Sequence, residues 1–74
     1  MNDQEKIAII RTALTTVTGK DPGDITQATL ISDFKIDSLG EVEVQMEIEE
    51  LVKISIPDAT QPVVTIKDLM NLIP

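Results

Sequence analysis

Residues 37–52 read DSLGEVEVQMEIEELV, and the fold class of the chain depends on whether this stretch forms a strand or a helix. From Glu41 to Glu49 acidic or polar residues alternate with apolar ones, which is the pattern of a half-buried strand. The composition instead favours a helix, because Glu, Gln, Met and Leu are good helix formers. The alternation alone leaves both structures open.

Two further features favour a helix. Ser38 and Glu41 have the spacing of a capping box, and residues 39–52 continue without a turn signal for longer than a usual strand. A helix here would have two apolar stripes, so we expect it to be packed on both sides, in the middle of a small bundle. The stripes are Leu39, Val42 and Met46 on one side, and Val44, Ile48, Leu51 and Val52 on the other.

Helices are also predicted near both ends of the chain. In residues 3–18 apolar residues recur at helical spacing, Asn2 and Glu5 form a capping pair, and Gly19 is a natural stop. Near the C-terminus, Thr65 and Asp68 form another capping pair. The apolar stripe of the first helix is Ile7, Ile10, Leu14 and Val17, and that of the last is Ile66, Leu69, Met70 and Ile73.

A long connection, residues 20–37, joins the first two helices. It begins with the turn signal Asp21-Pro22-Gly23-Asp24 and then carries single apolar residues without a sustained period. Connections of this length are uncommon unless they are functional or disordered. We expect its apolar side chains to hold it across the core; they are Ile25, Leu30, Ile31, Phe34 and Ile36.

A second irregular stretch precedes the last helix. Ile56-Pro57-Asp58 ends the acidic segment, and Pro62 limits the residues between that motif and the last helix to a turn or a short helix. The predicted fold class is therefore all-α. We expect one domain, residues 1–74, that forms a small four-helix bundle with a long connection between its first two helices and a short third helix.

The composition excludes several functions. The 74 residues include no His and no Cys, so the commonest general base, the thiol nucleophile and the soft metal ligands are missing, and we predict neither an enzyme nor a metal site. The net charge of −7 repels nucleic acid and anionic membrane and attracts basic partners. The N-terminus is polar and no apolar run is long enough to span a bilayer. We expect a cytoplasmic monomer without nucleic-acid or membrane partners.

In this order, the predicted elements resemble the acyl carrier protein family over essentially the whole chain. The segment DSL alone recurs by chance in many chains, but its combination with a following acidic segment and with IPD at the family's separation is specific. The resemblance also implies that residues 39–52 form a helix. It rests on Asp33-Phe34-Lys35-Ile36-Asp37-Ser38-Leu39, on Val42, Glu43, Met46, Glu49 and Glu50, on Ile56-Pro57-Asp58 and on Thr65-Ile66-Lys67-Asp68-Leu69.

By this resemblance, Ser38 is the attachment site of 4′-phosphopantetheine, which a phosphopantetheinyl transferase takes from coenzyme A. The thiol of that arm holds acyl groups as thioesters, which implies an acyl carrier for fatty acid, polyketide or related biosynthesis. A phosphate at a helix N-terminus meets unpaired N–H groups and the positive end of the helix dipole, in agreement with this assignment. The simpler alternative is that Ser38 only caps the helix.

The resemblance further implies that acyltransferases and synthases with basic patches dock beside the serine. Acidic surfaces of this kind mainly speed encounter and fix orientation. Simpler alternatives are a solvated face for the glutamates and ordinary core packing for Leu39 and Met46. The expected recognition residues are Asp37, Leu39, Glu41, Glu43, Met46, Glu49 and Glu50.

Two other functions stay open at this point: a D-alanyl or aminoacyl carrier of the same family, and an unmodified acidic helical adaptor. Peptidyl carriers usually have a Gly-Gly-x-Ser-Leu pattern, which residues 35–39 do not match. The family usually has Leu-Gly in place of Phe34-Lys35, and very often an acid in place of Gly40. These departures indicate a specialised carrier that serves a dedicated pathway.

Overall fold

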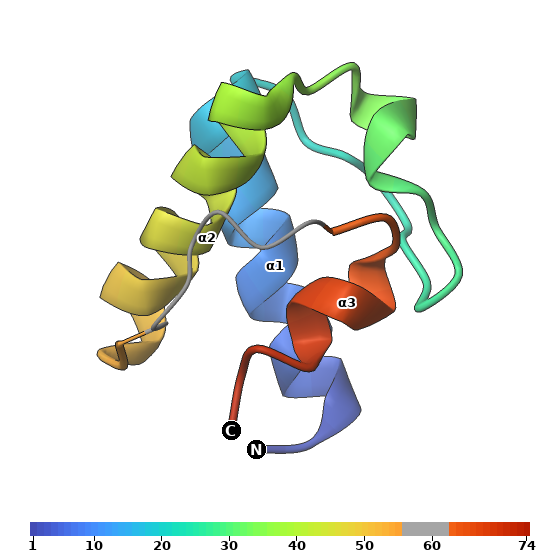
Figure 1. The fold of residues 1–74 in the computed structure, drawn as a ribbon. Coiled ribbons are helices and arrows are strands. Elements are labelled where there is room, and N and C mark those ends of the chain that lie inside the picture. The colour runs from blue at the N-terminus through green and yellow to red at the C-terminus, as the bar shows by residue number, and fades with distance from the viewer. Residues whose placement is uncertain (56–62) are drawn as a thin grey trace.

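The computed structural model describes residues 1–55 and 63–74. All regular elements in these ranges are helical: α1 (Asp3–Thr18), the 3-10 helix η1 (Ile31–Phe34), α2 (Ser38–Val52) and α3 (Ile66–Met70) (Figure 1). The all-α class is therefore confirmed for the described residues. The predicted short third helix and the motif of residues 56–58 lie outside them, so the four-helix bundle stays a prediction.

The first helix begins and ends where the sequence predicts. The side chain of Asn2 accepts a hydrogen bond from the Glu5 N–H at 2.8 Å, and the Glu5 carboxylate accepts one from the Asn2 N–H, which completes a capping box. At the other end, Gly19 has φ 76° and its N–H donates to the Thr15 carbonyl at 2.9 Å. This left-handed residue stops the helix at no steric cost because glycine has no Cβ.

The core lies around α1, which packs against both α2 and α3 (Figure 1). The buried apolar side chains from all parts of the described chain form one cluster, which consists of Ile10, Ala13, Leu14, Ile25, Ile31, Val44, Ile48, Val63, Ile66, Leu69, Met70 and Ile73. Each helix therefore depends on the others to remove its apolar face from water, since helices this short are marginal in isolation.

The alternating segment is a helix, α2, but its predicted position in the middle of the bundle is wrong. Val44 and Ile48 are buried, whereas Leu39 is 65% and Met46 57% exposed. Period-two alternation on a helix puts apolar residues on opposite sides, and only one side faces α1. The middle position belongs to α1, and α2 keeps an exposed apolar stripe.

The long connection is held across the core, as expected. Ile25 and Ile31 are buried in it, and Phe34 and Ile36 pack against the core cluster, while Leu30 is 43% exposed and does not contribute as predicted. Backbone hydrogen bonds tie the connection to the start of α3. The Ile31 N–H donates to the Val64 carbonyl and the Ile66 N–H donates to the Thr29 carbonyl, both at 2.9 Å.

The last helix begins at the predicted capping pair. The Asp68 N–H donates to the Thr65 hydroxyl at 3.4 Å, and the Asp68 carboxylate accepts from the N–H groups of Val64 at 2.8 Å and Thr65 at 3.1 Å. The helix ends at Met70, so Ile73 lies beyond it, in a turn that keeps its side chain buried. The residues from 63 to 73 are thus fixed both by this cap and by the core.

The cap of α3 predicts a pH dependence of stability. The two backbone N–H groups hold the pKa of Asp68 below its ordinary value. Because the pKa is lower in the folded than in the unfolded chain, the carboxylate stabilises the fold above the unfolded pKa of about 3.9 and loses this effect as the pH falls through the folded pKa.

We expect Asp68→Asn to lower the free energy of unfolding at pH 7, and the difference from wild type to shrink below about pH 4. Urea unfolding at a series of pH values measures this difference. Asp24→Asn, a change at an exposed acid outside the helix caps, is the control. A difference that stays constant down to pH 3 would rule out the carboxylate as the source.

Candidate functional site

The beginning of α2 is fixed by Asp37 and not by Ser38. Asp37 has an extended backbone (φ −81°, ψ −179°), and its Oδ1 accepts a hydrogen bond from the Gly40 N–H at 2.7 Å. The Glu41 N–H donates to the Asp37 carbonyl at 3.0 Å and starts the helical ladder. The predicted capping box of Ser38 with Glu41 is therefore wrong, because the preceding aspartate already satisfies the first turn.

Ser38 is the first helical residue and is exposed. Asp37 caps the helix, so the alternative prediction that Ser38 is the cap is wrong. Within residues 1–55 and 63–74, none of the side-chain hydrogen bonds involves the Ser38 hydroxyl. The hydroxyl is therefore accessible to a reagent or an enzyme. The end of α2 at which it lies is opposite the two chain termini (Figure 1).

The start of α2 suits a phosphate group. The N–H groups of the first helical turn lack intrahelical acceptors, and the helix dipole places partial positive charge there. Asp37 uses the Gly40 N–H, which leaves the N–H groups of Ser38 and Leu39 beside the serine side chain. A phosphate ester on the Ser38 oxygen is thus compatible with the residues present.

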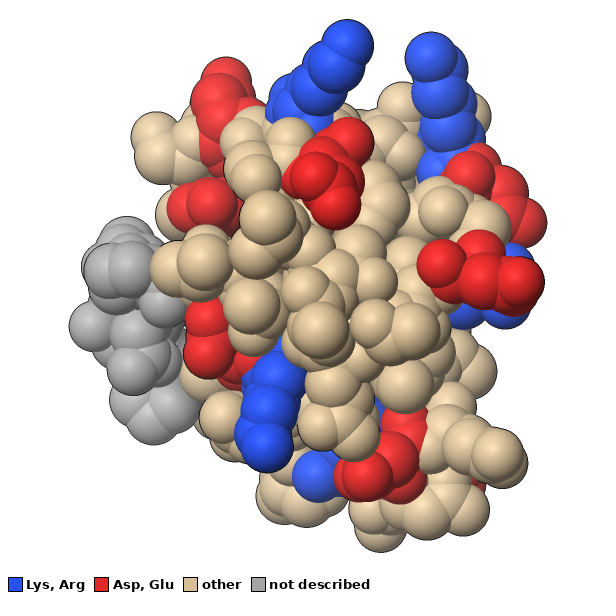
Figure 2. Space-filling model, turned by 90° about the vertical axis from the view of Figure 1, so that its right-hand side faces the viewer, with Lys and Arg blue, Asp and Glu red and all other residues tan. Residues whose placement is uncertain are grey.

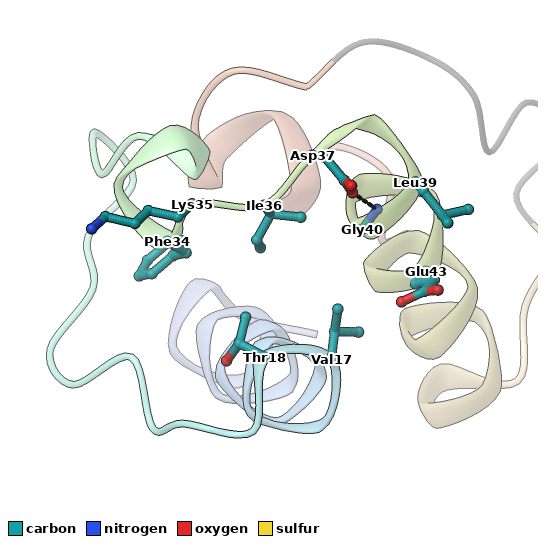
Figure 3. Close-up of a pocket in the computed structure, with 9 residues that line it drawn as sticks. All are labelled: Val17, Thr18, Phe34, Lys35, Ile36, Asp37, Leu39, Gly40 and Glu43. Atoms are coloured by element: carbon teal, nitrogen blue, oxygen red, sulfur yellow. Dashed lines mark hydrogen bonds between the residues drawn. The ribbon is translucent and has the colours of Figure 1, made fainter.

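Asp37 and Leu39, the chain neighbours of Ser38, line a groove that we call the serine groove, although Ser38 itself is not part of its lining (Figure 3). It has a volume of about 420 Å³ and lies between the end of α1, the connection and the first turns of α2. Val17 points from α1 toward Ile36, and Asp37 and Glu43 lie along the α2 side (Figure 3). Its lining is Val17, Thr18, Phe34, Lys35, Ile36, Asp37, Leu39, Gly40 and Glu43.

Four of the predicted recognition residues form one exposed stripe on α2. Their spacing of i, i+4, i+7 and i+11 puts them on one side of the helix, and this stripe consists of Leu39, Glu43, Met46 and Glu50. A second groove of about 380 Å³ between α1 and α2 is lined by the last three of these and by Thr16, Val17 and Glu47. The two grooves share Val17 and Glu43, so they continue along the same side of α2.

The other predicted recognition residues are placed differently. Asp37 lies at the cap and lines the serine groove, whereas Glu41 and Glu49 are half-buried and lie outside both grooves. Glu47, which was not among the predicted recognition residues, lines the second groove. Val17 was not predicted as part of the site, because it belongs to the apolar stripe of α1 and was expected only to pack in the core.

The acidic surface is local to α2. Residues 39–52 contain five glutamates and no Lys or Arg. On the side of the molecule that bears the connection and α3, by contrast, acidic and basic side chains are interspersed around a largely uncharged middle (Figure 2). A basic partner is therefore attracted to the side of α2 that flanks Ser38.

In the described residues no group of three or more His, Cys, Asp or Glu is arranged to hold a metal ion. No helix within the same ranges is long and apolar enough to cross a membrane. What the structure offers is an exposed serine at a helix N-terminus, close to a groove with mixed polar and apolar lining and to the exposed stripe of α2.

These features define a small helical domain with an exposed serine in the first turn of its second long helix. A comparison with models of protein families matches residues 8–73 to the family described as phosphopantetheine attachment site, so the chain belongs to this family of acyl and peptidyl carrier proteins. Neither a curated protein nor a solved structure gives a significant match. The family is non-catalytic and bears covalently attached 4′-phosphopantetheine. The predicted resemblance and cofactor are confirmed.

Lys35 occupies a position that favours glycine. Its φ is 56°, in the left-handed region, and its N–H donates to the Ser32 carbonyl at 3.1 Å to close η1. Its side chain points away from Asp37 (Figure 3). For a residue with a Cβ this conformation costs roughly 1–2 kcal/mol.

We expect Lys35→Gly to raise the free energy of unfolding by about 0.5–1 kcal/mol. Glycine removes the steric penalty in the folded chain, but it also makes the unfolded chain more flexible, which offsets part of this stabilisation. Lys67→Gly is the matched control. Lys67 is exposed within α3, where glycine is unfavourable, and its replacement should lower the free energy by about 1 kcal/mol. Urea denaturation measures both. Equal destabilisation by the two changes would contradict a strained Lys35.

Proposed function

We propose that Ser38 carries the 4′-phosphopantetheine arm and that the chain holds acyl groups as thioesters for delivery to separate biosynthetic enzymes, in fatty acid, polyketide or related synthesis. One observation carries this assignment. Asp37 takes over the capping of α2, which leaves an exposed serine hydroxyl in the first helical turn. The family match supplies the group that this hydroxyl would bear.

The attachment step is a phosphoryl transfer at the serine oxygen. The Ser38 oxygen forms a P–O bond to the phosphate next to the pantetheine part of coenzyme A, and its proton passes to a base of the transferase. The pyrophosphate bond of coenzyme A breaks, and 3′,5′-adenosine bisphosphate leaves. The chain contributes an accessible nucleophile and first-turn N–H groups that favour the product phosphate diester.

The attachment predicts a mass change that depends on one serine. After incubation with coenzyme A and a broad-specificity phosphopantetheinyl transferase, intact mass spectrometry should show one added phosphopantetheine in the wild type and none in Ser38→Ala. Ser32→Ala is the matched control, because Ser32 is another exposed serine in a short helix, and this variant should be modified like the wild type.

The same experiment separates the carrier from the unmodified adaptor. An unmodified wild type with an intact helical circular dichroism spectrum would favour the adaptor, as would modification of Ser38→Ala at another residue. Once the arm is attached, loading with acyl and with D-alanyl donors distinguishes an acyl carrier from an aminoacyl carrier. The mismatch of residues 35–39 with the Gly-Gly-x-Ser-Leu pattern favours acyl cargo.

We further propose that the exposed stripe of α2 is the docking surface for the transferase and for acyltransferases and synthases with basic patches. Leu39 and Met46 supply apolar contact at 65% and 57% exposure, and Glu43 and Glu50 supply charge. Asp37 borders the serine groove. Glu41 and Glu49 lie off the stripe, so we expect smaller contributions from them.

Charge reversal on the stripe should slow association. We expect Glu43→Lys to lower kcat/KM for the transferase by about 10-fold at low salt, because electrostatic steering changes the rate of encounter, and the loss should diminish at high salt. Asp24→Lys makes the same change in net charge on an exposed residue of the connection. Equal losses in both variants would indicate an effect of net charge and would contradict a docking role for the stripe.

A further inference from the structure

Gly40 is required by the space around it and not by its backbone conformation. It lies in the right-handed first turn of α2 and is buried. A Cβ built there would overlap Cγ2 of Ile36, and it would lie 3.3 Å from Oδ1 of Asp37. The Ile36 side chain therefore occupies the space that the side chain of residue 40 would need.

The contact of Ile36 with Gly40 spans the attachment site. Ile36 precedes the cap residue Asp37, and Gly40 donates its N–H to that cap, so Ser38 lies between two residues that touch each other. Apolar residues just before a helix cap often pack onto the first turn and fix the angle at which the chain enters the helix. In this chain the side chain of Ile36 packs against the backbone of Gly40.

The same contact shapes the surface next to the serine. Ile36, Leu39 and Gly40 all line the serine groove. Ile36 is half-buried and packs against the core cluster, so it joins the core to the first turn of α2. A shift of Ile36 would therefore change both the entry of the connection and the orientation of Ser38.

We propose that the Ile36–Gly40 contact positions Ser38 for the enzyme that modifies it; this rests on the attachment at Ser38 proposed above. Ile36 and Gly40 are positioning residues. They place the cap and the serine, and neither of them belongs to the exposed stripe of α2. Their effect should therefore fall on the rate of transfer and not on docking.

A double-mutant cycle tests the proposal, with a broad-specificity phosphopantetheinyl transferase and coenzyme A as the assay. Gly40→Ala should force Ile36 from its place and lower kcat by about 10- to 100-fold with KM little changed, since a displacement of about 1 Å costs this much when groups must be aligned. Ile36→Ala leaves the space empty and should lower kcat less. In the double variant the methyl group introduced at position 40 fills that space, and kcat should return to within about threefold of the wild type.

Helix propensity alone predicts a different result for Gly40→Ala. Alanine is a better helix former than glycine. If the only effect of Gly40 were to weaken α2, Gly40→Ala would raise the melting temperature and leave kcat unchanged. Amide chemical shifts of Ser38 and Leu39 in the unmodified chain give a second readout. They should move in Gly40→Ala and return in the double variant.

The control is Ile9→Ala, which makes the same change at a half-buried position on α1 that lines neither groove beside α2. It should change the melting temperature without changing kcat. A wild type that is not modified at Ser38 would overturn the function proposed above. A modified wild type with additive single effects, or with kcat values that follow the melting temperature across all four variants, would overturn only the positioning role.

Discussion

The hydrogen bond from the Gly40 N–H to the Asp37 carboxylate, 2.7 Å long, fixes where α2 begins, and the site depends on that beginning. If Ser38 capped the helix, its oxygen would be engaged with the backbone and its side chain would be turned onto the first turn. Because the cap is one residue earlier, the serine is helical, exposed and adjacent to unpaired N–H groups. Helix capping is usually considered a matter of stability. In this chain it also decides which of two neighbouring side chains is accessible.

Helix stability does not explain the charge pattern of α2. Glu41 in the first turn is favourable to the helix dipole, but Glu50 lies near the end of the helix, where an acid is unfavourable and the last turn contains no basic residue. Glu43 and Glu47 are like charges at i, i+4, which costs about 0.2–0.5 kcal/mol. The helix persists because Val44 and Ile48 are buried against the core. The core thus stabilises a helix whose exposed side carries negative charges that the helix itself does not need.

The sequence predicted the elements well where local chemistry decides them. Asn2 with Glu5, Gly19, and Thr65 with Asp68 mark helix ends through short-range hydrogen bonds, and all of them form as predicted. It failed where a side chain has two local choices. Asp37 and Ser38 are both good caps, and only the course of the connection decides between them. Likewise the exposure of Leu39 and Met46 depends on which side of α2 meets α1, and the alternating pattern does not contain that information. Val17 lines both grooves because of the way α1 packs against α2, and nothing in the neighbouring sequence predicts this.

The junction before α2 combines two choices that local stability would not favour. Lys35 has a left-handed backbone that suits glycine, and Gly40 is in a right-handed helix that suits most other residues better. Each choice costs on the order of 1 kcal/mol. Strain of this size persists when surrounding contacts determine the conformation, and it concentrates at functional sites. At Gly40 the determining contact is with Ile36. Residues 35–40 are therefore held by a mutual fit around Ser38, and a single change toward a better helix former would disturb that fit.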